Sequence, residues 1–131
     1  MSTLSVGTIK SITSAGPVFQ NTSGLEMGVL VRAWVNFDGT TNTGGNCTIR
    51  DSFNVSSVAD NNTGTYTANF TTAFSDNDFC AFCSGGHDSN SSTPRGFETV
   101  YNYQTTSVKF DFRNESGSEA DPEVGCLVVV R

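Results

Sequence analysis

Four cysteines and one histidine are the side chains of this 131-residue chain best suited to binding a metal or acting as nucleophiles. Cys80 and Cys83 form a Cys-x-x-Cys pair, and His87 follows four residues later. A structural zinc site usually needs a second close pair of ligands, whereas Cys47 and Cys126 each stand alone in an apolar segment. Positions three apart in a strand face opposite sides, so Cys80 and Cys83 should point apart. We expect free thiols that act as small buried apolar side chains, with a disulfide or a zinc site as alternatives.

The remaining residues do not readily form a catalytic group. His87 is the only histidine, so any triad would depend on one residue in a polar loop. Asp76 and Asp78 form a carboxylate pair, but this spacing is also common in solvated turns. The chain has no phosphate-binding glycine loop, no dinucleotide-binding fingerprint and no His-Glu-x-x-His motif. We therefore expect no enzyme, no cofactor and no bound metal.

The charge of the chain and the lack of long apolar runs exclude nucleic acids and membranes as expected partners. The net charge is −6 and the seven basic residues are scattered, whereas contacts with nucleic-acid phosphates need clustered Lys or Arg. No run of about 18 apolar residues occurs, so no membrane insertion is expected. Residues 1–19 have no continuous apolar core, and we expect no secretory signal there.

Short segments in which apolar and polar residues alternate must position the cysteines, the histidine and the carboxylates named above. Val29–Phe37 is the most apolar of them, with large side chains on both faces, and Thr65–Ala73 alternates most cleanly. Further strands are expected at Cys47–Asn54 with a weak continuation to Val58, and at Phe79–Ser84, Phe97–Tyr103, Ser107–Arg113 and Val124–Val130. Glycine- and Asn-rich turns separate them, and no segment has helical periodicity. This pattern predicts an all-β, antiparallel β-sandwich or jelly roll of seven or eight strands.

The first 28 residues are only weakly patterned, so we divide the chain into an N-terminal arm (1–28) and a β-domain (29–131). An arm that cannot bury its own apolar residues often packs on a neighbouring subunit, although it could equally lie along its own domain. Trp34, the only tryptophan, is expected in the core or at an interface. The residues predicted at an oligomer interface are Leu4, Val6, Ile9, Val18, Phe19 and Trp34.

Two segments resemble a known family. The run Arg-Ala-Trp-Val-Asn-Phe-Asp-Gly (32–39) and the run from Ile49 to Ala73 are similar to a module of tailed-bacteriophage structural proteins. This module occurs in tail fibres and short fibre-like proteins, many from phages of marine cyanobacteria. Residues 1–10 and Val18–Asn21 also resemble the N-termini of such proteins, so the resemblance covers about residues 1–79.

The resemblance implies a non-enzymatic and trimeric β structure of the virion, used in appendages and in host attachment. The chain departs from a complete long tail fibre, because it has no long shaft, no heptad repeat and no collagen-like repeat. The expected location is therefore a fibre tip, short fibre or knob, in contact with other virion proteins. Two alternatives remain open: a capsid decoration protein that stabilises the particle, and a small hydrolase of surface polysaccharide.

A protein of this class would bind a host-surface glycan with its polar loops. Aromatic rings beside Asn or Asp side chains can stack on sugar rings, and the long polar loop 85–96 is the best candidate of this kind. The predicted receptor-binding residues are His87, Asp88, Arg95, Tyr101 and Tyr103.

Overall fold

The computed structural model describes residue 23, residues 30–87 and residues 95–131, and these residues form eight β-strands and no helix. The strands are β1 (Val31–Thr43), β2 (Asn46–Phe53), β3 (Val55–Asn62), β4 (Thr65–Phe70), β5 (Cys80–Gly86), β6 (Arg95–Gln104), β7 (Ser107–Asn114) and β8 (Val124–Val130). The predicted arm, apart from residue 23, lies outside the described residues, so the division into arm and domain stays a prediction. No described segment is a helix of the length and apolarity that crossing a membrane requires.

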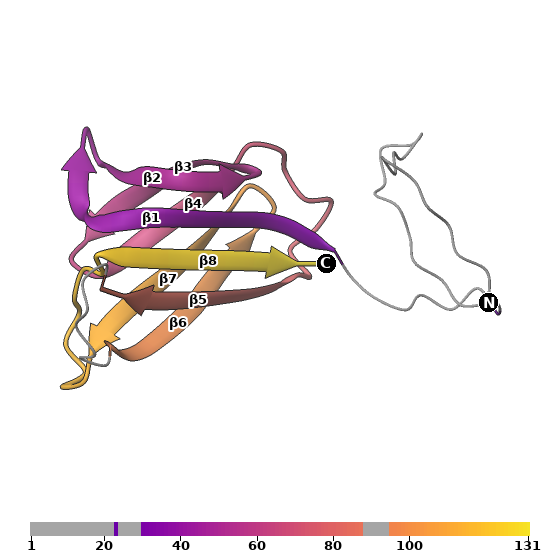
Figure 1. Ribbon diagram of the computed structural model, residues 1–131. Helices are drawn as coiled ribbons and strands as arrows, with labels where there is room; N and C mark the ends of the chain where they lie inside the picture. The colour runs from indigo at the N-terminus through magenta and orange to yellow at the C-terminus, as the bar shows by residue number, and fades with distance from the viewer. Residues whose placement is uncertain (1–22, 24–29, 88–94) are drawn as a thin grey trace, which may run out of the picture. The chain divides into compact units, whose positions relative to one another are not determined.

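All pairings between neighbouring strands are antiparallel, in the order β5-β8-β1-β2-β3-β4-β7-β6. The sheet curls until its two edge strands, β5 and β6, lie side by side (Figure 1). At this seam the Gly85 N–H donates a hydrogen bond to Glu98 Oε1 at 3.3 Å. The predicted all-β antiparallel fold of seven or eight strands is confirmed, with its strands in one nearly closed sheet.

The core lies inside this curl and follows the alternation of the sequence. Ala33, Val35 and Phe37 of β1 are buried, and β1 is a central strand, between β8 and β2. Alternate residues of β4 and β7 point inward in the same way, because side chains point to opposite faces at every second position of a strand, and in β7 the outward Asp111 is buried as well. The inward residues of these two strands are Tyr66, Ala68, Phe70, Val108, Phe110 and Phe112.

Four aromatic rings fill the centre of the core. Phe37, Tyr66, Phe110 and Phe112 have ring centroids between 5.1 and 6.3 Å apart, mostly in edge or tilted contacts that suit aromatic quadrupoles. Gly125 of β8 lies directly against this cluster, and a Cβ atom at that position would come within 2.4 Å of the Phe37 ring. The absence of a side chain at Gly125 therefore makes the room for Phe37.

Asp121 fastens the loop between β7 and β8 to this core. The Tyr66 hydroxyl donates a hydrogen bond to Asp121 Oδ1 at 2.6 Å and lies 3.1 Å from the Gly39 carbonyl oxygen. The Gly64 N–H donates to the same carboxylate oxygen at 2.6 Å. Burial, and then the hydrogen bond with Asp121, raise the pKa of Tyr66 above its ordinary value, so the hydroxyl keeps its proton and acts as a donor.

The structure corrects two details of the predicted strands. The segment 47–58 is broken at Asn54, whose φ of 55° lies in the left-handed region, so it forms the separate strands β2 and β3. The stretch between the strands expected at Val29–Phe37 and Cys47–Asn54 is mostly strand: β1 continues to Thr43, and the chain turns tightly at Gly44 and Gly45. Both glycines have positive φ, which explains why this tight turn can replace a longer loop.

Candidate functional site

Large apolar side chains form a row on the outer face of four adjacent strands. Phe82 of β5 lies opposite Val128 of β8, and Val128 lies opposite Trp34 of β1. Trp34 in turn lies opposite Phe53 of β2. We call Phe82, Val128, Trp34 and Phe53 the apolar row. The exposed fractions are 64% for Phe82, 55% for Phe53 and 36% for Val128, so water reaches most of the row.

The residues beside the row towards β5 and β8 carry no charge. Cys80 and Val130 lie opposite each other on one side of the row, and Ser84 and Cys126 do so on the other side. Asn36 of β1 lies opposite Cys126, and its Nδ2 group donates a long hydrogen bond of 3.5 Å to Cys126 Sγ. This part of the sheet is therefore a largely neutral surface with an aromatic centre.

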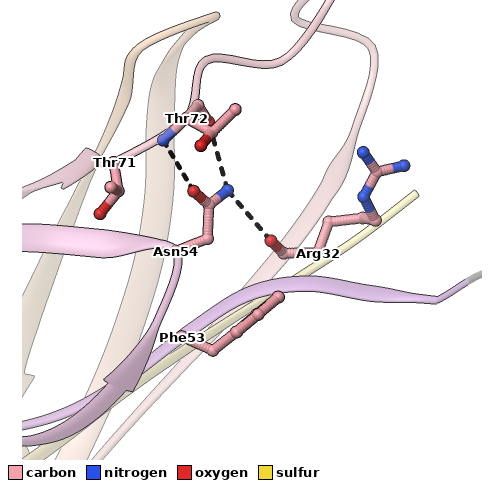
Figure 2. A pocket seen from close by; sticks show the side chains of 5 residues that line it. All are labelled: Arg32, Phe53, Asn54, Thr71 and Thr72. Atoms are coloured by element: carbon pink, nitrogen blue, oxygen red, sulfur yellow. Dashed lines mark hydrogen bonds between the residues drawn. The ribbon is translucent and has the colours of Figure 1, made fainter. Parts of the chain in front are cut away.

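The row ends in an open cleft of about 380 Å³ beside Phe53. The cleft is lined by Arg32, Phe53, Asn54, Thr71 and Thr72. Asn54 forms its floor: its Nδ2 group donates to the carbonyl oxygens of Arg32 and Thr72, at 3.1 and 3.2 Å, and its Oδ1 atom accepts from the Thr72 N–H at 2.7 Å. In Figure 2 the Arg32 guanidinium points away from Asn54. The floor is thus held by hydrogen bonds that tie β1 to the end of β4.

We expect the Asn54→Ala substitution to lower the free energy of unfolding by about 2 kcal/mol, because it removes three hydrogen bonds and leaves alanine in a left-handed conformation. Asn54→Gly is the matched control, since it removes the same hydrogen bonds without the backbone strain. Urea unfolding should show that the native protein is the most stable, the Asn54→Gly variant less stable and the Asn54→Ala variant the least stable. Equal stability of all three would show that the Asn54 contacts contribute nothing.

Two of the predicted receptor-binding residues can be placed near the end of β5 and the start of β6. His87 directly follows β5, and its Nδ1 atom lies 3.3 Å from Glu123 Oε1 in the loop before β8. Arg95 begins β6, where its backbone lies opposite Asn114. Asp88 lies outside the described residues. His87 is thus in contact with a loop carboxylate at the same end of the domain as the start of β6.

The two predicted receptor-binding tyrosines face opposite sides of the sheet, whereas strict alternation along the expected strand Phe97–Tyr103 would place both on one face. Asn102, between the tyrosines, has a φ of 50°, and the β6–β7 register shifts after Tyr101. This bulge reverses the alternation. Tyr101 stays 37% exposed, whereas Tyr103 packs against the core with its ring centroid 5.2 Å from that of Phe79. The predicted receptor-binding residues therefore do not form one surface.

The predicted oligomer-interface residues have one described member. Trp34 lies at the centre of the apolar row, between Val128 and Phe53. Leu4, Val6, Ile9, Val18 and Phe19 lie outside the described residues, so their role stays a prediction. Sequence reasoning missed the row itself, although the outward positions of Phe53 and Phe82 in their alternating segments were a signal for it.

The four cysteines are separate thiols in different environments. Cys80 is exposed and Cys83 packs against the core, so the two point apart, as the strand geometry predicts. The expectation that all four are buried holds only for Cys47: Cys80 is exposed, because β5 turns this position outward, and Cys83 and Cys126 are half-buried. Burial raises the pKa of both Cys47 and Cys83 to about 12, which keeps these two thiols protonated near neutral pH.

We expect Cys80 to react first with a thiol reagent such as iodoacetamide at pH 8. The thiolate is the reactive species, and a pKa of about 12 leaves almost none of it at Cys47 or Cys83. Intact mass and peptide mapping should show the earliest label at Cys80, a later one at half-buried Cys126, whose pKa is raised by burial, and labels at Cys47 and Cys83 only in urea. The Cys80→Ser protein is the control and should lose the early label. Early labelling of Cys83 would contradict this assignment.

Most of the described carboxylates are engaged in local contacts. A hydrogen bond from the Thr40 hydroxyl, together with nearby Arg50, lowers the pKa of Asp38. The hydrogen bond from Arg131 lowers the pKa of Asp76. Within residues 30–87 and 95–131, no three His, Cys, Asp or Glu side chains gather into a group that could hold a metal ion. The apolar row and the cleft are consequently the features of the described surface that most suggest binding.

No protein-family model, no curated protein and no solved structure matches this chain.

Proposed function

We propose that this chain is a structural protein of a tailed-phage virion, a tail-fibre or knob-type component that contributes to attachment to the host surface. The observation that carries the proposal is the exposed apolar row, which suits assembly with other protein subunits better than it suits catalysis. The resemblance of residues 32–39 and 49–73 directs this assembly role to the virion. A homotrimer, contacts with other virion proteins and a host-surface glycan as receptor are parts of the same proposal.

The resembling segments supply connected parts of the fold. Residues 32–39 lie in β1, and residues 49–73 run through β2, β3 and β4. The hydrogen bonds that join Arg32, Asn54 and Thr72 lie wholly within these segments. The similarity to the phage module thus falls on residues that form one contiguous half of the sheet, and this supports its use as a guide to function.

The proposal is tested by locating the protein on intact phage particles with a gold-labelled antibody against this chain. Label on the tail or its fibres is the expected result, and adsorption to host cells would then be measured with His87 and Tyr101 replaced. Label spread over the head would overturn the tail-fibre assignment in favour of capsid decoration. Particles without label would overturn a virion role altogether.

A further inference from the structure

The exposed large apolar side chains of the described residues are confined to one part of the surface. They belong to β1, β2, β5, β6 and β8, and β3, β4 and β7 contribute none. The six residues are Val31, Phe53, Phe82, Phe97, Tyr101 and Val128. Such a one-sided distribution differs from the scattered single apolar residues that are normal on protein surfaces.

The strand register makes most of this surface continuous. Strands in a sheet lie about 4.8 Å apart, so the four residues of the apolar row span roughly 14 Å between the outermost strands. Gly85 contacts Glu98 across the seam, and Phe79 contacts Tyr103. Phe97 and Tyr101 of β6 are exposed on the strand that lies across the seam from β5.

The exposed area is large enough for a protein contact. A whole aromatic side chain has an area of about 150–250 Å², so the exposed parts of Val31, Phe53, Phe82 and Val128 amount to on the order of 400 Å². This lies within the range of the largest apolar patch on a monomer, about 300–600 Å². It is about half of the roughly 800 Å² that each partner contributes to a stable interface.

We propose that the apolar row is the surface on which a second copy of this chain packs, with Trp34 at the centre of the contact. The row has the composition of an interface core, because it is aromatic and its neighbours on β5 and β8 are uncharged. The rest of the described outer surface, on β3, β4 and β7, offers no exposed apolar residue to pair with it. Within the described residues, the apolar surface that matches the row in size and shape of strand packing is the same row of another copy.

This inference deepens the assembly role proposed above by naming the contact surface, but it can fail separately. A protein that is monomeric in solution yet present on particles would remove the interface and leave the virion role. A protein that associates through the row but is missing from particles would do the reverse.

Trp34 gives the test a direct signal, because it is the only tryptophan and it lies in the row. The full chain would be diluted from tens of micromolar to nanomolar concentration, with its mass followed by analytical ultracentrifugation and Trp34 emission by fluorescence. We expect an oligomer at high concentration, and a shift of Trp34 emission to longer wavelength as it dissociates.

Two variants place a charge in the row at exposed positions, Phe82→Lys and Phe53→Lys, and each should weaken self-association at least tenfold. The matched control is Thr67→Lys, which places the same charge on the outer face of β4 and should leave the association unchanged. Circular dichroism and urea unfolding check that all three variants keep the fold.

Three results would overturn the proposal. The first is a protein that stays monomeric at every concentration. The second is an oligomer that Phe82→Lys and Phe53→Lys leave intact. The third is a monomer in which these two variants, unlike Thr67→Lys, lower the urea midpoint strongly, since the row would then be covered by residues of its own chain.

Discussion

Replacing Gly125 by alanine is expected to lower the free energy of unfolding by about 3 kcal/mol, because the added methyl group has no space. Its Cβ atom would lie 2.4 Å from two atoms of the Phe37 ring, well inside van der Waals contact. Phe37 cannot move away easily, since it is fully buried and packs against the rings of Tyr66, Phe110 and Phe112. Either β8 must shift from β1 or the aromatic cluster must repack.

Gly86→Ala is the matched control for this experiment. Gly86 lies one residue after Gly85, the direct partner of Gly125 in the β5–β8 ladder, and a Cβ atom at Gly86 would meet nothing within 4 Å. We expect the Gly86→Ala variant to unfold at the same urea concentration as the native protein. If Gly125→Ala were as stable as Gly86→Ala, the close approach of β8 to the Phe37 ring would be wrong.

The second large effect is expected for Asp121→Ala, which should also cost about 3 kcal/mol of stability. The substitution removes the acceptor for both the Tyr66 hydroxyl and the Gly64 N–H, two hydrogen bonds to a charged group. The Tyr66 hydroxyl would keep only its longer contact of 3.1 Å with the Gly39 carbonyl oxygen, inside the core. Urea unfolding at pH 7 measures the loss.

A double-mutant cycle with Tyr66→Phe separates the two hydrogen bonds. Tyr66→Phe removes the hydroxyl and leaves the contact between Asp121 and the Gly64 N–H. The double variant should therefore be less destabilised than the sum of the single variants, with a coupling energy of about 1–2 kcal/mol. Additive effects would mean that the Tyr66 hydroxyl and the Asp121 carboxylate do not interact.

The sequence was sufficient to predict the class of fold and most of the strands. Alternation in Thr65–Phe70 and Ser107–Asn114 identifies the inward residues of β4 and β7 correctly, because one face of each strand must be buried. The break at Asn54 and the bulge at Asn102 were missed. Both depend on one residue adopting positive φ, which asparagine tolerates but does not require.

The apolar row was harder to foresee, because it depends on pairings between distant strands. Trp34 is visibly an outward residue of β1, but its neighbour Val128 lies in the last strand, and Phe82 reaches it only through the β5–β8 register. The alternation of apolar and polar residues assigns each side chain to one face of its strand, but it does not show which strands are neighbours in the sheet. The predicted receptor-binding set failed in a related way, since one bulge separated Tyr101 from Tyr103.

The position of β8 in the sheet has a consequence for how the protein is made. Within the described strands, β5 has a single ladder partner, β8, and β8 is the last strand to leave the ribosome. β1 to β4 can pair as successive hairpins while synthesis continues, whereas Phe82 and Cys83 must wait for Val124–Val130. The nascent chain therefore carries an unpaired apolar strand until Val124–Val130 has emerged, and a chain that stops before Val124 lacks the ladder partner of β5.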